Sequence, residues 1–163
     1  MASTEVLGTY LNDHLSGANA GVEMAQRLHK RAAGGPDAAV LARLAEDIKQ
    51  DREELRRLVE QLGEAGHRVK KAAGWVAGKA HRLAVGELLT GDEHLSMLLE
   101  TETLALGIEG KLALWEALLA VASAYPQLAE SDLSRLAVRA QEQRGRIETV
   151  RLAAARRSFT SPS

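Results

Sequence analysis

The chain has 163 residues, of which 45% are hydrophobic and 26% charged, with a net charge of −1 and no cysteine. This length and composition predict one compact domain, and the lack of cysteine excludes disulfides, thiolate metal sites and a cysteine nucleophile. The nearly neutral charge and an aromatic content of only 3% argue against a surface that binds nucleic acid.

Hydrophobic residues recur at helical spacing in four long segments, and no segment alternates convincingly like a β-strand. The predicted helices cover about residues 4–32, 36–63, 91–124 and 131–157. Gly34-Gly35 ends the first helix, Pro36-Asp37 opens the second, and Pro126 stops the third. We therefore predict a single helical domain over residues 1–157, followed by a disordered tail at 158–163.

The connections between these helices differ in length. The first and last turns are short, which predicts two antiparallel helical hairpins, whereas the roughly thirty residues of 63–90 are far longer than an ordinary helix–helix loop. A connection of that length can return the chain to its starting end. The predicted fold is therefore an all-α antiparallel four-helix bundle with a long crossover between helices 2 and 3.

The crossover itself contains a short amphipathic segment. If residues 66–83 are helical, Val69, Ala73, Val76, Ala80 and Leu83 form one apolar stripe, and most of the basic residues lie elsewhere. Such a helix either covers the bundle or, through its lysines and Trp75, contacts a membrane surface or a partner. Because no signal peptide and no membrane-spanning run are evident, we expect a cytoplasmic protein.

Acidic residues interrupt the apolar pattern of the third predicted helix. Glu102, Glu109 and Glu116 are seven residues apart, so they form one stripe, which the neighbouring Leu and Ala residues place on the apolar face. Gly107 and Gly110 flank Glu109, which indicates close packing or a local distortion. Burial of a carboxylate is costly unless it is paired, hydrogen-bonded or bound to a metal. Glu116, near the end of this helix, is expected at the surface, and Glu102 and Glu109 remain as the inward acids.

Three further polar residues are predicted to face inward, one on each of the other helices. Asp51 stands within the regular stripe of the second helix, which reads Leu41, Leu44, Ile48, Asp51, Leu55, Leu58 and Leu62. His14 occupies an inward position of the first helix, together with Leu7, Tyr10, Gly17, Gly21, Met24 and Leu28. In the fourth helix, Gln143 belongs to the inward stripe and Arg144 follows it.

In helix lengths, crossover and inward acids, the chain resembles the ferritin-like superfamily over about residues 4–157. That resemblance implies carboxylates from four helices and a Glu-x-x-His pair on two of them, around two metal ions. Here only His67 has a glutamate, Glu64, three positions before it, and the fourth helix contains no histidine. The standard dimetal site therefore does not carry over to this sequence.

Two interpretations of the polar residues stay open. His14, Asp51, Glu102 and Glu109 offer the imidazole and carboxylate ligands of a noncanonical site for Fe, Mn or Zn. Alternatively, these groups form a hydrogen-bonded polar layer that sets the helix register, with Lys111 or Arg144 as the partner of Asp51.

No phosphate-binding loop, nucleophile elbow or zinc-protease motif occurs in the sequence. The leading prediction is therefore a non-catalytic structural or interaction protein with a degenerate metal site. A metal-binding protein or oxidoreductase is the first alternative, and a peripheral membrane protein that binds through residues 66–83 is the second. Because Leu104, Ile108 and Trp115 extend the apolar surface of the third helix, we also predict a homo-oligomer, a dimer.

Overall fold

The computed structural model describes residues 2–65, 92–129 and 131–160, and this part of the chain is all-helical. Four long helices dominate it: α1 (Ala2–Arg31), α2 (Ala38–Ala65), α4 (Glu93–Val121) and α5 (Leu133–Thr160). Two single-turn 3₁₀ helices, η1 (Ala122–Ala124) and η2 (Pro126–Leu128), connect α4 to α5. The all-α prediction is confirmed.

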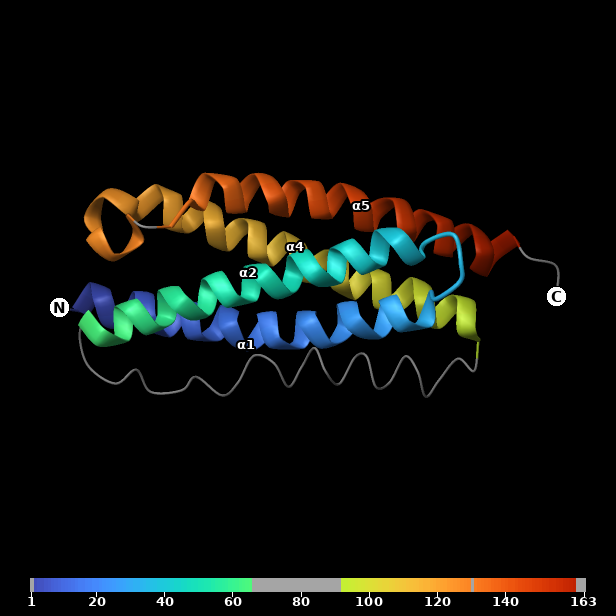
Figure 1. The fold of residues 1–163 in the computed structure, drawn as a ribbon, viewed down its shortest axis with the longest axis horizontal. Coiled ribbons are helices and arrows are strands. Elements are labelled where there is room, and N and C mark those ends of the chain that lie inside the picture. The colour runs from blue at the N-terminus through green and yellow to red at the C-terminus, as the bar shows by residue number, and fades with distance from the viewer. Residues whose placement is uncertain (1, 66–91, 130, 161–163) are drawn as a thin grey trace.

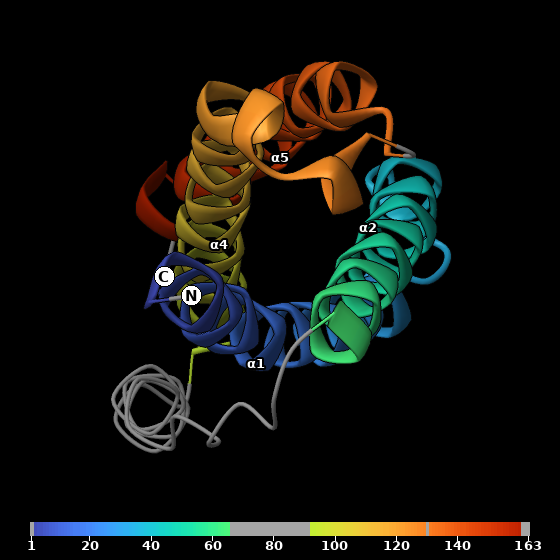
Figure 2. The ribbon, with the colours of Figure 1, turned by 90° about the vertical axis from the view of Figure 1, so that its left-hand side faces the viewer.

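The helices form two antiparallel hairpins, α1 with α2 and α4 with α5 (Figure 1). Viewed end on, they surround a common core in the order α1, α2, α5, α4 (Figure 2). In Figure 1, α2 and α4 run in one direction and α1 and α5 run in the other, so α4 begins at the end of the bundle opposite to the one where α2 ends. The predicted short helix of residues 66–83, and with it the predicted membrane contact, lies outside the described residues.

Short polar residues and one glycine set the helix boundaries. Gly34 takes a positive φ of 78° between α1 and α2, a conformation in which a side chain would be strained. The Asp92 carboxylate accepts hydrogen bonds from the backbone amides of His94 and Leu95, at 2.8 and 3.1 Å, and so caps the first turn of α4. The Asp132 carboxylate accepts one from the amide of Arg135 at 3.0 Å, which confirms the predicted start of the last helix.

Helix α5 continues three residues beyond the predicted end of the domain at 157. The hydroxyls of Ser158 and Thr160 donate hydrogen bonds to the carbonyls of Ala154 and Arg156, at 2.9 and 2.6 Å. These side chains therefore bond within the last turns of the helix, which the polar composition of the tail did not predict.

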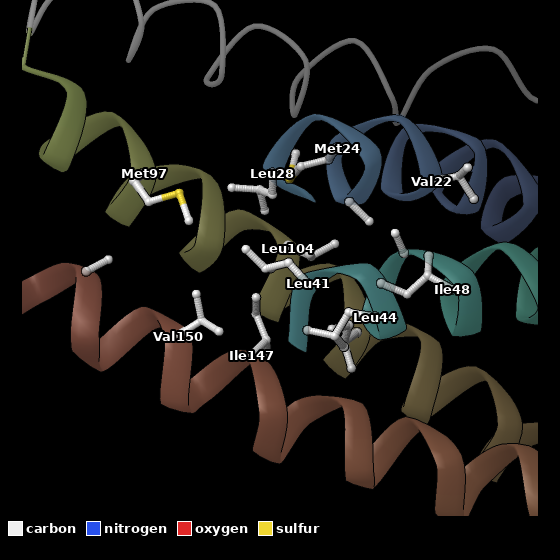
Figure 3. Packing of buried hydrophobic residues seen from close by; sticks show 14 of the residues in the cluster. Val22, Met24, Leu28, Leu41, Leu44, Ile48, Met97, Leu104, Ile147 and Val150 are labelled. Carbon is white, nitrogen blue, oxygen red and sulfur yellow. The ribbon is translucent and has the colours of Figure 1, made fainter. Parts of the chain in front are cut away.

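The apolar core is divided into two clusters along the bundle axis. The cluster nearer the α1–α2 turn, called here the turn-side core, contains Val22, Met24, Ala25, Leu28, Leu41, Leu44, Ala45, Ile48, Met97, Leu98, Leu104, Ile108, Ile147, Val150 and Ala154. Its side chains project inward from all four helices (Figure 3). The other, called here the N-terminal-side core, contains Leu7, Leu11, Leu55, Leu58, Leu62, Leu112, Leu114, Trp115, Leu118, Leu128, Leu133, Leu136, Ala137 and Ala140.

The predicted inward faces are right for two helices and wrong in part for the others. Every residue of the predicted α2 stripe is buried, and so is the α5 stripe from Leu133 to Ala154. On α1, the predicted Leu7, Met24 and Leu28 are buried. Tyr10, His14, Gly17 and Gly21 are only half-buried, because Leu11, Val22 and Ala25 take the inward positions between them.

The prediction that Glu102 and Glu109 of the α4 stripe face inward is wrong. Glu109 and Glu116 are exposed and Glu102 is half-buried, whereas Leu104, Ile108 and Trp115 are buried in the core. Helix α4 is apolar on nearly every side, so its hydrophobic periodicity does not single out one inward face. The acid of α4 that is buried is Glu100.

Candidate functional site: a buried polar layer

A polar layer made of Asp51, Lys111, Arg139 and Gln143 separates the two halves of the core. Along α2, Asp51 falls between Ile48 of the turn-side core and Leu55 of the N-terminal-side core. On α4 and α5, Lys111 and Gln143 likewise fall between residues of the two clusters. The layer therefore crosses the bundle at the junction of its two apolar clusters.

Asp51 is the centre of this layer and is only 1% exposed. Its Oδ2 accepts a hydrogen bond from Lys111 Nζ at 2.6 Å and another from Gln143 Nε2 at 2.9 Å. Its Oδ1 accepts one from Arg139 Nη2. Both carboxylate oxygens are thus bound by donors that come from α4 and α5, as a buried carboxylate requires.

The donors are connected to one another and to the surface. Lys111 Nζ also donates to Gln143 Oε1, so that the Gln143 amide uses both its donor and its acceptor within the layer. Arg139 Nη1 donates to Gln50 Oε1 at 3.1 Å, at the outer edge of α2. Three helices are therefore joined by one hydrogen-bonded network, in a register that a shift of any one helix would break.

Burial shapes the electrostatics of the layer. Desolvation lowers the pKa of the Lys111 ammonium from its ordinary value of 10.5, and the nearby Arg139 lowers it further, while the Asp51 carboxylate opposes the shift. Two cationic side chains share one buried carboxylate, so the neutral form of Lys111 is more accessible in the folded protein than in water.

This shift predicts a rise of stability with pH that depends on Lys111. Because the folded protein releases the Lys111 proton at a lower pH than the unfolded chain does, the unfolded chain binds more protons in the interval below 10.5. The free energy of unfolding of the wild type, minus that of Lys111→Met, should therefore increase from neutral pH toward pH 10.5. Chemical denaturation of both proteins over this range measures the difference. A difference that is flat or falls with pH would contradict the lowered pKa.

Ion pairs flank the layer along both seams of α5. Toward α2, Arg146 contacts Asp47 at 2.7 Å and Arg157 contacts Asp37 at 2.8 Å. Toward α4, Arg144 contacts Glu109 at 2.9 Å and Arg151 contacts Glu102 at 3.5 Å. These pairs are more exposed than the Asp51 network, so each contributes at most about 1 kcal/mol.

A second buried acid, Glu100, lies where α4 faces the end of α1. It is 6% exposed, and Arg31 and Arg27 approach its carboxylate at 3.2 and 3.8 Å. Sequence reasoning missed this residue because it lies outside the heptad series of Glu102, Glu109 and Glu116. A usable signal was present, since Arg27 and Arg31 are four residues apart and project from one face of α1.

The four predicted metal ligands do not share one site. Asp51 is enclosed by the polar layer, whereas Glu109 and Glu102 pair with arginines at the α4–α5 seam. His14 is half-buried on α1, where its ring contacts that of Tyr10 edge to face, with ring centroids 4.6 Å apart. Within the described ranges, no group of three or more His, Cys, Asp or Glu side chains could hold a metal ion.

Of the two partners predicted for Asp51, Lys111 is right and Arg144 is wrong. Arg144 follows Gln143 by one residue, so it is rotated by about 100° toward α4 and pairs with Glu109 instead. Arg139, which the prediction omitted, lies four residues before Gln143 and thus on the α2-facing side of α5. Arg139 could have been identified from the sequence, because it lies four residues before Gln143, a polar residue at a core position.

We compared the chain with known protein families, curated proteins and solved structures. A scan against protein families, a search of curated proteins and a search of solved structures each gave no match. Within the described ranges, no helix is long and apolar enough to cross a membrane.

Proposed function

We propose that this chain is a non-catalytic structural or interaction protein, a ferritin-like bundle whose degenerate metal site is a polar layer. One observation carries the proposal: both oxygens of the buried Asp51 accept hydrogen bonds from cationic side chains, Lys111 and Arg139. The positive charge that a metal ion would supply at a buried carboxylate is here supplied by the chain itself.

Electrostatics favours this interpretation over metal binding. A divalent ion at Asp51 would lie beside an ammonium and a guanidinium, and in a poorly hydrated core that repulsion is strong. Soft or borderline metals also need imidazole or several carboxylates, and the Asp51 network contains one carboxylate and no histidine. A buried polar network of this kind sets the register of helices rather than adding to their stability.

The ferritin-like part of the proposal rests on helix direction. Two hairpins in which α2 and α4 run in the same direction are the arrangement of bundles with one long crossover, as in ferritin-like folds (Figure 1). A simple up-down-up-down bundle alternates the direction of consecutive helices, so it would place α2 and α4 antiparallel to each other. The ring order here is α1, α2, α5, α4 (Figure 2).

Metal content tests the proposal. Purified protein is incubated with excess Fe²⁺, Mn²⁺ or Zn²⁺, freed of unbound ion by gel filtration, and analysed for metal per chain alongside His14→Ala and Glu109→Gln. We expect substoichiometric metal in all three proteins, because neither variant removes a ligand of an existing site. One or two ions per wild-type chain, lost in both variants, would overturn the proposal in favour of a His/carboxylate metal site.

A further inference from the structure

The outer face of α4 carries a second heptad pattern that the core does not use. Opposite the buried face lie Leu99, Thr103, Leu106, Gly110, Ala113, Ala117 and Ala120, at spacings of four and three residues. Leu106 is 65% exposed, and the three alanines are exposed as well. This outer stripe has the spacing of a helix that packs against another helix.

Helix α5 continues this surface on the same side of the hairpin. Val138, Gly145, Leu152 and Phe159 follow one another at intervals of seven residues, and the three large side chains are 54%, 40% and 72% exposed. Between the two stripes runs the seam of the ion pairs Glu109–Arg144 and Glu102–Arg151. The outer face of the α4–α5 hairpin is therefore apolar on both sides of a charged, paired centre.

The opposite hairpin has a different surface. The exposed positions of α2 are mostly charged, and its Arg56 and Arg57 form ion pairs with glutamates of the same helix. Among the described residues of α1 and α2, Val6 is the single exposed large hydrophobic side chain. Leu119 and Val121 are also exposed, at the end of α4, but most of the exposed large hydrophobic side chains of the described residues lie on the outer face of the α4–α5 hairpin. Such a concentration is typical of a protein–protein interface.

The order of large and small residues on α4 identifies the partner. The leucines, Leu99 and Leu106, lie in the first half of the stripe, and Ala113, Ala117 and Ala120 lie in the second half. An antiparallel copy of the same stripe, with its midpoint between Glu109 and Gly110, sets Leu106 of one copy against Ala113 of the other and Leu99 against Ala120. We propose, resting on the interaction role inferred above, that this face binds a second copy of the chain about a two-fold axis near Gly110.

Size and charge both fit a two-fold dimer. Residues 99–120 span about 33 Å and two packed helices about 20 Å, which gives on the order of 700 Å² per copy, close to the roughly 800 Å² of a standard interface. A two-fold axis near Gly110 also brings two Glu109–Arg144 pairs together. Because Glu109 and Arg144 are each more than half exposed, they are free to exchange partners across the interface without leaving an unpaired charge.

Among the residues that the structure describes, no contact accounts for a glycine at position 110. A Cβ built on Gly110 would meet no atom within 4 Å, although glycine disfavours a helix interior by about 1 kcal/mol relative to alanine. Packing of a second helix against α4 at Gly110 explains why this position is a glycine, because the smallest side chain permits the closest approach of two helices.

Sedimentation equilibrium of the full chain tests the dimer. We expect the wild type to be dimeric at micromolar concentration, and Leu106→Glu to weaken dimerisation at least about 100-fold, since both copies would then bury a carboxylate. Val6→Glu, an equally exposed site on α1, should leave the dimer intact. A wild type that is monomeric up to 100 μM would overturn the proposal. A monomer in which another segment of the same chain covers Leu106, so that this side chain is inaccessible to solvent, would overturn it as well.

Cysteine cross-linking tests the orientation, because the chain has no cysteine of its own. Gly110→Cys should link to itself on mild oxidation, while Leu99→Cys should link to Ala120→Cys in a mixture but not to itself. Self-linking of Leu99→Cys as efficient as that of Gly110→Cys would indicate a parallel pair and contradict the proposal. Metal content is independent of these readouts, so failure of the dimer and failure of the proposed function are distinguished.

Discussion

Asp51→Asn is expected to lower the free energy of unfolding by about 3–5 kcal/mol, the cost of leaving buried charges without their counter-charge. Asparagine keeps the shape of the side chain, so the loss reports charge and hydrogen bonding rather than a cavity. Lys111 and Arg139, with side chains 14% and 16% exposed, would then face an amide, one end of which is itself a donor. Urea denaturation followed by circular dichroism measures the change.

Asp47→Asn is the matched control, one turn earlier on the same helix. Its partner Arg146 is bound at a similar distance, but both side chains reach solvent, so we expect a loss of at most about 1 kcal/mol. Equal losses in the two variants would contradict a special role for the polar layer. Replacing the whole layer together, Asp51→Leu, Lys111→Met, Arg139→Met and Gln143→Leu, should recover most of the stability that Asp51→Asn loses.

Trp115→Ala is expected to destabilise the protein by about 3–5 kcal/mol, because it removes the largest side chain of the N-terminal-side core. Trp115 is 0% exposed, and α4 contacts both α1 and α5, so the surrounding helices have little freedom to fill the cavity. Thermal and chemical denaturation measure the loss. A loss below about 1 kcal/mol would show that this end of the bundle repacks freely.

The indole nitrogen of Trp115 gives the matched comparison. Among the described residues it has no hydrogen-bond partner, although it is buried, so Trp115→Phe removes an unsatisfied donor together with part of the ring. We therefore expect Trp115→Phe to cost less than half as much as Trp115→Ala. Equal costs for the two variants would show that the indole nitrogen stabilises the fold through a contact the structure does not contain.

The helical bundle could be predicted from the sequence because two helices have one-sided patterns. The stripe from Leu41 to Leu62 on α2 and the stripe from Leu133 to Ala154 on α5 are interrupted only by Asp51 and Gln143, and all their members are buried. Helix α4 has no polar side of its own, so its orientation is decided by packing against its neighbours α1 and α5. Its inward face could not be predicted from its own residues.

The polar layer could be predicted in part. Asp51 and Gln143 stand out as polar residues at core positions, and a lysine partner for Asp51 follows from the need to pair a buried carboxylate. The choice between Arg139 and Arg144 depends on which side of α5 faces α2, and that is a property of the assembled bundle. Glu109 is attached to α5 by an ion pair at the surface, so its place in an apolar segment did not indicate burial.

Anomalous scattering from crystals grown with excess Mn²⁺ tests the central claim most directly, that cations of the chain itself occupy the place of a metal at Asp51. We expect no anomalous peak in the core, and electron density for Lys111 Nζ within hydrogen-bonding distance of Asp51 Oδ2, as in the structure described here. An ordered Mn²⁺ on the Asp51 carboxylate, with Lys111 displaced from it, would contradict the account.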